Sequence, residues 1–539
     1  MRCVSMQTNC GNEPPRRDGV SLSRRSFWKV LYASIALGMV LLSAVIVRIP
    51  YLATRSVWYD EASSWQMSQF SLPELWYACQ LNVHPPLYYL VLKAWSFVWG
   101  DSPVALRSLS IACSALAIVG IFTIGWLSGG GNGVKDARDF DNGKLYVAIV
   151  AATLMAVNAF QVNAGIEARM YALGTAFAVW SVVATIRVFR SNSTLWWIVL
   201  AFLLLSCTYT HHYCLLVAAS EVAVLAVYGL MRWLRHSDHS VIRRLGGLVT
   251  GVGFGFLPGV LLLHIQLQRV RENYWTVPLG KDVIVKTFSQ FWQPIEPANA
   301  YESGLCVFVV LLLCTALTIR HRSIEKCLVS CCAWLPIVLA GIVSSLVTPI
   351  WEGRFFRFNE PFFLVVIPLG LQQISQRQTL RWGFAAIVVA VVSYGTWVFW
   401  NARQVEQRGG MRAATEFVLQ NSRPCELVLA TSNIHYFPAK YYLRGQREIK
   451  LLRDAVREFW GHHLIRPRDL IGLAQLERFR ERGIWLLGHS SRPREIAWTD
   501  DGQDHREIFH YDFGVPQWTV YVIHIQGRVA SSENKQGNK

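Results

Sequence analysis

The sequence predicts an α-helical, polytopic membrane protein of about eleven transmembrane helices with a small C-terminal α/β domain. Hydrophobic residues make up 53% of the chain and charged residues only 16%. The charges are concentrated at the N-terminus, in short clusters and beyond residue 400. Between them lie apolar runs such as residues 30–47, 245–263 and 327–347, long enough to cross a hydrocarbon core of about 30 Å. A soluble protein has no use for so many such runs.

Basic residues beside the apolar runs predict the orientation of the chain. With the N-terminus inside, every inside connection is basic, as the positive-inside rule requires. The segments predicted to span are residues 28–48, 105–127, 145–160, 171–188, 195–210, 213–231, 245–266, 304–319, 327–348, 361–375 and 382–400. The first is longer than a signal-peptide core and no small-residue cleavage site follows it, so we expect an uncleaved helix.

Residues 84–100 decide which side the C-terminus lies on. This segment is apolar, but it carries Lys93 in its middle and begins with two prolines, so we interpret it as a helix at the outer interface. The predicted divisions are a cytoplasmic tail (1–27), a transmembrane domain (28–400) with a first outer loop (49–104), an extracytoplasmic α/β domain (401–529) and a disordered tail (530–539). Strands are expected at 427–430, 484–487, 507–511 and 520–525, and helical segments at 414–419 and ending at 441–442.

The net charge of +17 does not indicate a nucleic-acid-binding protein, because the Lys and Arg residues mostly flank apolar runs. Most of the 12 cysteines lie inside apolar segments, where cysteine acts as a small hydrophobic residue. Their spacing suggests neither a disulfide framework nor a structural zinc site.

Two outward-facing clusters in the first outer loop contain candidate catalytic residues. Asp60 and Glu61 are adjacent carboxylates at the membrane surface, which suit a general base or a metal ligand. On spacing alone, an aromatic belt with solvated acids is the slightly better interpretation. His84 precedes two prolines that fix the backbone and present the ring reproducibly. A lone interfacial histidine is more often structural.

Further candidates lie at the outer ends of later helices. Glu167, Arg169 and Tyr171 form one group, and His211 and His212 form another. Charges so close to apolar runs pair with one another or face a cavity.

A short outward loop adds Arg354 and Arg357, which contradict the positive-inside trend. A bound anion explains them, because the planar guanidinium suits phosphate oxygens. Snorkelling to lipid headgroups is the alternative.

In order, these motifs are WYDEA, HPPLYY, GDSPVALR, EARMY, THHY and PIWEGR, followed by GMRAATEFV and KYYL. Their order and spacing resemble the bacterial glycosyltransferase family 39, which belongs to the GT-C fold and includes protein O-mannosyltransferases and aminoarabinose transferases. The resemblance covers roughly residues 30–450. It implies an inverting transfer from a polyprenyl-phosphate sugar at the outer face of a bacterial inner membrane.

The resemblance also implies roles for single residues. Asp60 matches the family's catalytic aspartate, with Glu61 beside it. His84 falls where the aminoarabinose transferases have a lysine near the donor phosphate, and Arg354 where the family has an arginine close to it. Asn82 and Val83 precede His84, where the family often has an acidic residue, so a second carboxylate there is in doubt. Glu167 is a candidate substitute.

Several alternatives stay open from sequence alone. A transporter or flippase of a lipid-linked sugar would need charges at mid-depth, whereas the charges here fall at helix ends. A non-catalytic membrane scaffold is the other alternative. A divalent metal ion near Asp60 and Glu61 is not supported by a ligand set. The sugar and the acceptor (lipid, protein or glycan) are not encoded in any recognisable motif.

Overall fold

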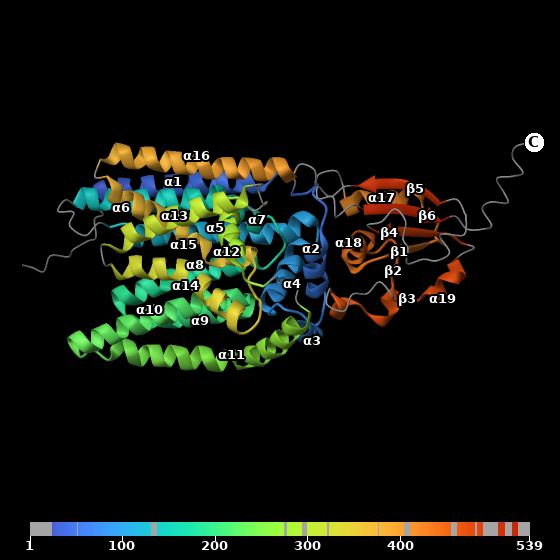
Figure 1. Cartoon of the computed structure of the whole chain (residues 1–539), viewed down its shortest axis with the longest axis horizontal. Helices are drawn as coiled ribbons and strands as arrows, with labels where there is room; N and C mark the ends of the chain where they lie inside the picture. Colours follow the sequence, from blue (N-terminus) through green and yellow to red (C-terminus); the bar gives the residue numbers. More distant parts are fainter. Residues whose placement is uncertain are drawn as a thin grey trace, which may run out of the picture.

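The computed structural model describes residues 24–50, 52–130, 137–273, 278–293, 299–320, 323–375, 377–403, 410–453, 461–479, 482–488, 505–511 and 520–525. The predicted N-terminal tail lies almost wholly, and the predicted disordered tail wholly, outside these residues. Figure 1 shows a long helical bundle at the left and a smaller sheet domain at the right, with short helices between them.

Long helices form the bundle. Within the described residues, eight helices are long and apolar enough to cross a membrane, or nine if one bent pair counts as a single span. The eight are α1 (Arg24–Arg48), α5 (Pro103–Ser128), α8 (Tyr171–Ser191), α10 (His212–His236), α11 (Ser240–Asn273), α13 (Ala300–Ile319), α14 (Ile324–Leu346) and α16 (Gln378–Arg403). Two shorter apolar helices, α9 (Thr194–Thr210) and α15 (Glu360–Ile374), lie where spans are predicted. The polytopic fold is confirmed, whereas the count of eleven stays a prediction.

The bent pair consists of α6 (Ala137–Val157) and α7 (Ala159–Gly165), which meet at an angle of 63°. Asn158 ends α6 and starts α7, because its side chain accepts a hydrogen bond from the Gln161 N–H (3.1 Å). The carbonyls left open at the end of α6 are bound by Arg48, which donates to Ala156 O (2.7 Å). A buried arginine thus stabilises the break between α6 and α7.

Three short helices form the segment predicted as the first outer loop (49–104): α2 (Tyr59–Ser68), α3 (Leu72–Leu81) and α4 (Leu87–Trp99). Helix α4 has 13 residues and, at 1.5 Å per residue, is too short to span a membrane. Lys93 on α4 donates to Ser68 O (3.2 Å) and Phe70 O (3.0 Å), so it caps the end of α2. This arrangement agrees with the prediction that residues 84–100 do not cross the membrane.

Two connecting elements complete the helical region around the site. Helix α12 (Lys281–Gln290) packs against α13, and the 3₁₀ helix η1 (Gly353–Phe358) leads into α15. Contacts of η1 with α8 and α10 bring the predicted arginine loop against the N-terminal ends of those helices.

The C-terminal domain contains one six-stranded sheet with the strand order β3-β2-β1-β4-β6-β5. Its strands are β1 (Leu427–Ala430), β2 (Ile449–Leu452), β3 (Leu470–Ile471), β4 (Ile484–Gly488), β5 (His505–Tyr511) and β6 (Val520–Ile525). Strands β1 to β4 pair in parallel, and β4, β6 and β5 pair antiparallel. The helices α17 (Gly410–Asn421) and α18 (Asn433–Leu443) match the helical expectations, and the predicted α/β domain is confirmed. Short β2 and β3 were not predicted.

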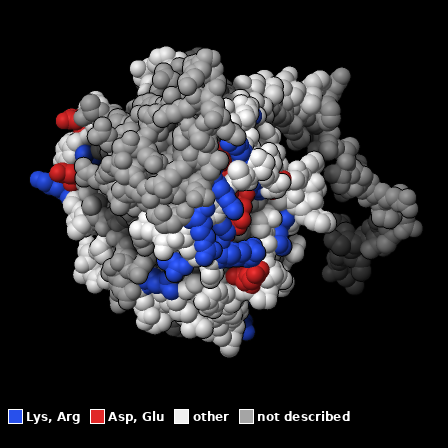
Figure 2. All heavy atoms as spheres, turned by 90° about the vertical axis from the view of Figure 1, so that its right-hand side faces the viewer, with Lys and Arg blue, Asp and Glu red and all other residues white. Residues whose placement is uncertain are grey.

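The sheet domain is docked onto the first outer loop through α18. Tyr442 Oη accepts a hydrogen bond from the Val57 N–H (2.7 Å), and Tyr441 Oη donates to Asp101 O (2.7 Å). Arg444 forms an ion pair with the Asp101 carboxylate (3.0 Å). Figure 2 views the molecule from this end, where blue basic and red acidic side chains lie next to one another. The loop that carries Asp60 is therefore held by both parts of the chain.

Candidate active site

Glu61 lies at the centre of a buried ion-pair network. Its side chain is 1% exposed, and Arg107 binds it through Nε (2.8 Å) and Nη2 (2.6 Å). The Ala168 N–H donates to Oε1 (3.0 Å), and Arg55 adds an ion pair at 3.4 Å. Fixed donors thus occupy both oxygens of this carboxylate.

This network makes Glu61 a weak base. Burial alone would raise the pKa of Glu61, but the charge and hydrogen bonds of Arg107 outweigh it and lower the pKa to about 2. Arg107 also donates to the carbonyls of Leu52 (2.7 Å) and Ser56 (3.0 Å). It therefore fixes the backbone that leads into α2, and we infer a positioning role for Glu61.

Asp60 lies outside that network, although it is the next residue on the chain. Its side chain is 19% exposed, and Arg169 Nε lies 3.8 Å from Oδ2. Arg169 also donates to Asp60 O (3.4 Å) and to Ser64 Oγ (3.3 Å). A partly exposed carboxylate with one loose ion pair is accessible to a substrate hydroxyl.

Arg169 connects Asp60 to His84. Its Nη2 lies 3.1 Å from His84 Nε2, and because a guanidinium has no acceptor, the imidazole nitrogen must accept this hydrogen bond. Burial, and after it the charge of Arg169, holds the pKa of His84 well below its ordinary value. His84 is therefore neutral at physiological pH, and the cations of this cluster are arginines.

His211 continues the cluster from the junction of α9 and α10. Its ring centroid lies 5.3 Å from that of His84 and 4.9 Å from that of Phe355. Arg354, the residue before Phe355 on η1, is 34% exposed and lies 3.5 Å from Glu352. Arg169 and Arg354 are both close enough to lower the pKa of His84 and His211 electrostatically.

The second predicted arginine has a different environment. Arg357 is 4% exposed, forms an ion pair with Glu167 (3.5 Å) and lies over the ring of Tyr171 (4.6 Å). Glu167 therefore pairs across the chain with Arg357, while Arg169, two residues after Glu167, turns to Asp60. Arg357, Glu167 and Tyr171 are therefore buried, whereas the Arg354 side chain is partly exposed.

His212 also has a structural partner. Its Nε2 lies 2.5 Å from Gln266 Oε1, and Gln266 Nε2 donates to Cys79 O (2.6 Å) and His84 O (3.4 Å). Gln266, on α11, was not predicted as a site residue. It links α10 and α11 to the loop that presents His84, so His212 acts on the cluster through Gln266.

The residues around Asp60 do not suit a divalent cation. The oxygens of Glu61 are occupied by Arg107 and Ala168, and a guanidinium stands beside Asp60. Hard cations prefer several unoccupied oxygen ligands. Across the described residues, no group of three or more His, Cys, Asp or Glu could hold a metal ion.

Sequence reasoning missed Arg107 and Glu221. Arg107 ends the motif GDSPVALR, but nothing local to it reveals that it binds Glu61. Glu221 is the tenth residue of α10, so the expectation that charges fall only at helix ends is wrong for this residue. It is fully buried, and Ser181 (2.6 Å) and Thr185 (2.7 Å) on α8 bind its two oxygens. These contacts enclose Glu221 between helices, away from Asp60.

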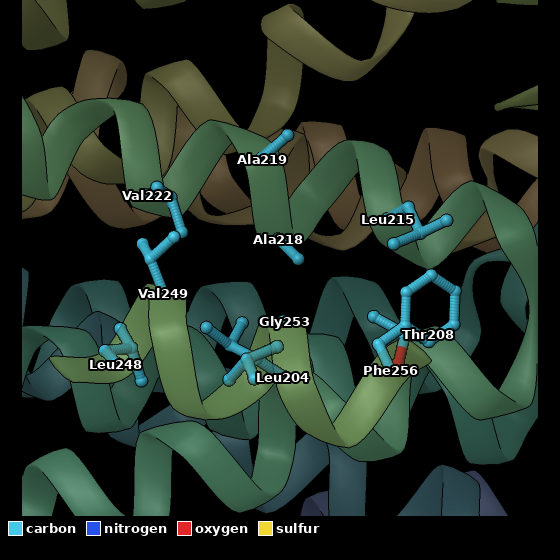
Figure 3. A pocket seen from close by; sticks show the side chains of 11 residues that line it. Leu204, Thr208, Leu215, Ala218, Ala219, Val222, Leu248, Val249, Gly253 and Phe256 are labelled. Carbon is cyan, nitrogen blue, oxygen red and sulfur yellow. The ribbon is translucent and has the colours of Figure 1, made fainter. Parts of the chain in front are cut away.

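An apolar groove of about 280 Å³ lies between α9, α10 and α11. Figure 3 shows its side chains approaching one another from the three helices. The lining residues are Leu204, Thr208, Leu215, Ala218, Ala219, Val222, Leu248, Val249, Val252, Gly253 and Phe256. The Thr208 hydroxyl donates to Leu205 O (2.8 Å), so it needs no partner in the groove. Thr208 precedes His211 by about one helical turn.

Solved structures of known proteins share this architecture. ArnT from Cupriavidus metallidurans bound to undecaprenyl phosphate matches 94% of this chain and 99% of its own, with a TM-score of 0.59 and 13% sequence identity. The same protein in the apo state matches 93% and 98%, with a TM-score of 0.57 and 12% identity. No protein-family model and no curated protein matches the sequence. The predicted fold is confirmed: this chain is a multi-pass membrane protein with the fold of the GT-C glycosyltransferases.

Proposed function

We propose that this protein transfers a sugar from a polyprenyl-phosphate carrier to an acceptor hydroxyl, with inversion, at the outer face of a bacterial inner membrane. The observation that carries the proposal is the cluster at the outer end of the bundle. There Arg169 lies between an accessible carboxylate, Asp60, and a cluster that contains the neutral rings of His84 and His211 and the cation of Arg354. One side suits an acceptor hydroxyl and the other an anionic leaving group.

The chemistry needs these two functions and little else. The Asp60 carboxylate takes the proton of the acceptor hydroxyl as the acceptor oxygen bonds to the anomeric carbon. The bond from that carbon to the phosphate oxygen breaks, and its electron pair leaves with the phosphate. Arg354 stabilises the developing negative charge, assisted by His84. A single displacement inverts the anomeric centre.

A lipid carrier also needs space for a hydrocarbon chain. The groove lined by Thr208 and its neighbours has an apolar surface and lies about one turn below His211. The structurally similar ArnT is bound to undecaprenyl phosphate. By this analogy, we propose that the phosphate occupies the basic cluster and that the acceptor, a lipid, protein or glycan, approaches Asp60 from the side of the sheet domain.

The test is to incubate the purified protein in nanodiscs with a panel of labelled polyprenyl-phosphate sugars and candidate acceptors. A transferase converts the donor to free polyprenyl phosphate and glycosylated acceptor in equal amounts. A flippase would move intact donor between leaflets, and a scaffold would leave it unchanged, so either result contradicts the proposal.

The Arg354→Lys variant tests the anion site in the same assay. Lysine keeps the charge but loses the planar fork, so we expect donor affinity and turnover to fall by about 1–3 kcal/mol, the scale of hydrogen bonds to charged groups. Donor kinetics like those of the wild type would rule out the assignment of Arg354.

A further inference from the structure

His211 is a buried residue whose hydrogen-bonding capacity is only half used. Its side chain is 3% exposed, and its ring packs between those of Phe355 and Phe358 at 4.9 and 4.8 Å. Its Nδ1 accepts a hydrogen bond from the Tyr213 N–H (3.1 Å), which caps the first turn of α10. A neutral imidazole that accepts at Nδ1 carries its proton on Nε2. The backbone thus fixes the tautomer of His211.

The Nε2–H group of His211 has no hydrogen-bond partner among the described residues, although it is fully shielded. Buried donors are normally paired, so an orphan donor calls for an explanation. The neighbouring His84 does not provide one, because its Nε2 already accepts from Arg169 and its other ring nitrogen must then carry a proton. The two adjacent rings therefore have their tautomers fixed by different partners.

The charged groups near His211 are also donors. Arg169 and Arg354 are close enough to act on its charge, and His212 donates to Gln266. Arg169 and Arg354 pair with Asp60 and Glu352, and as donors they offer no acceptor to the Nε2–H of His211. A phosphate oxygen supplies that acceptor.

We propose that the Nε2–H of His211 donates a hydrogen bond to a non-bridging oxygen of the carrier phosphate. This assignment rests on the proposed function and gives His211 a direct contact with the ligand. The donor is neutral, so it orients the phosphate, whereas Arg354 supplies the positive charge. If His211 only capped α10 and packed between Phe355 and Phe358, loss of its Nε2–H would leave phosphate binding unchanged.

Binding of undecaprenyl phosphate to the full-length protein in nanodiscs tests the proposal. We expect His211→Phe, which keeps an aromatic ring, to weaken binding by about 10- to 100-fold, as for other hydrogen bonds to a charged group. His211→Gln offers an amide N–H and should recover most of that loss. His264→Phe is the matched control, since His264 is an exposed residue of α11 bonded to Gln268. Thermal unfolding of each variant separates binding from folding.

The outcomes separate the two proposals. If the wild-type protein does not bind undecaprenyl phosphate, the proposed function fails. If it binds and His211→Phe binds equally well, only the assignment of His211 is overturned. If His211→Phe does not fold, His211→Asn replaces it, because asparagine can cap α10 but is too short to take the place of the Nε2–H. Binding by His211→Asn equal to that of the wild type would overturn the assignment.

Measuring undecaprenyl phosphate binding by the wild type and His211→Phe at several pH values distinguishes a neutral donor from a cation. The ligand, His84 and His212 titrate in the same way in the wild type and in His211→Phe. The ratio of the two proteins' dissociation constants for undecaprenyl phosphate should therefore stay constant between about pH 6 and pH 8. A ratio that grows toward low pH would show that His211 acts as a cation and would overturn the proposal.

Discussion

Asp60 and Glu61 are neighbours on the chain with different surroundings. Both begin α2, but successive helical residues point about 100° apart, so one carboxylate faces the bundle and the other faces the site. Glu61 meets Arg107 and Arg55, whereas Asp60 meets only the edge of Arg169. The sequence could predict that one of the two carboxylates is functional. It could not assign the roles, because Arg107 is distant on the chain and reaches Glu61 only through packing.

The first prediction separates these roles by stability. Glu61→Gln leaves the buried Arg107 and Arg55 without their counter-charge, so we expect a loss of roughly 3–5 kcal/mol, the cost of breaking a buried ion pair. Asp60→Asn is the matched control and should unfold close to the wild type, because Asp60 is partly exposed and loosely paired. Thermal unfolding in detergent measures both, and a stable Glu61→Gln protein would contradict the positioning role.

The second prediction concerns acid stability. The pKa of Glu61 is lowered from 4.5 to about 2 in the folded protein, so its ionised form stabilises the fold above about pH 4.5. This contribution, on the order of 3 kcal/mol, should be lost progressively as the pH falls toward 2. The stability difference between wild type and Glu61→Gln should therefore shrink over that interval. A difference that is independent of pH would argue against an ionised Glu61.

The remaining site residues show how far pattern recognition extends. His84, Arg169, His211 and Arg354 come together from four separate segments. Each was singled out from the sequence, but their assembly into one cluster was not. The pairing of Glu167 with Arg357 was not predictable, because Glu167 and Arg169 lie in the turn between α7 and α8, where nearby side chains project in different directions. Tertiary packing, and not sequence proximity, selects the partner.

At the scale of elements, α18 holds α2 in place. The Tyr442 hydroxyl accepts a hydrogen bond from the Val57 N–H just before α2, and the rings of Tyr441 and Trp65 pack edge to face at 5.2 Å. The domain that carries α18 begins beyond residue 400, yet it contacts the loop with the proposed base. We infer that the sheet domain is part of the active site's framework.

The third prediction tests this contact with Tyr442→Phe, which keeps the ring and removes the acceptor. The Val57 amide should exchange with solvent faster, and stability should fall by about 1 kcal/mol, the net value of one hydrogen bond. Tyr77→Phe is the control, because Tyr77 on α3 is 63% exposed. Unchanged exchange at Val57 would show that α18 does not hold this segment.

The strands illustrate which elements a sequence predicts. Strands β1, β4, β5 and β6 are runs of hydrophobic or alternating residues and were recognised within a few positions. Strands β2 and β3 have four and two residues and depend on neighbouring strands for their hydrogen bonds. Such short segments form through tertiary pairing, so local propensity does not reveal them.

At the scale of the whole molecule, the proposed chemistry is concentrated at one end of the bundle. The helices α2, α3 and α4 of the first outer loop lie there beside α18 (Figure 1), and η1 contacts α8 and α10. The fold class followed from hydrophobicity and charge, because the membrane imposes long apolar helices with basic inside connections. Which side of the membrane this end faces depends on the number of spans.

The fourth prediction determines that orientation with a native residue. Cys425 is exposed on the sheet domain, so a membrane-impermeant maleimide should label it in intact cells with a permeable outer membrane. Cys425→Ser should remove that label and serve as the control. Labelling of Cys425 only after the inner membrane is broken would place the domain in the cytoplasm and contradict the eleven-helix arrangement.

The central claim is that Asp60 is the general base of a glycosyl transfer from a polyprenyl-phosphate sugar. The most direct measurement compares transfer rate with donor binding in the wild type and Asp60→Asn. The amide keeps the shape and loses the basicity, so binding should persist while transfer falls by about 10²–10⁴-fold. Transfer by Asp60→Asn at the wild-type rate would contradict the account.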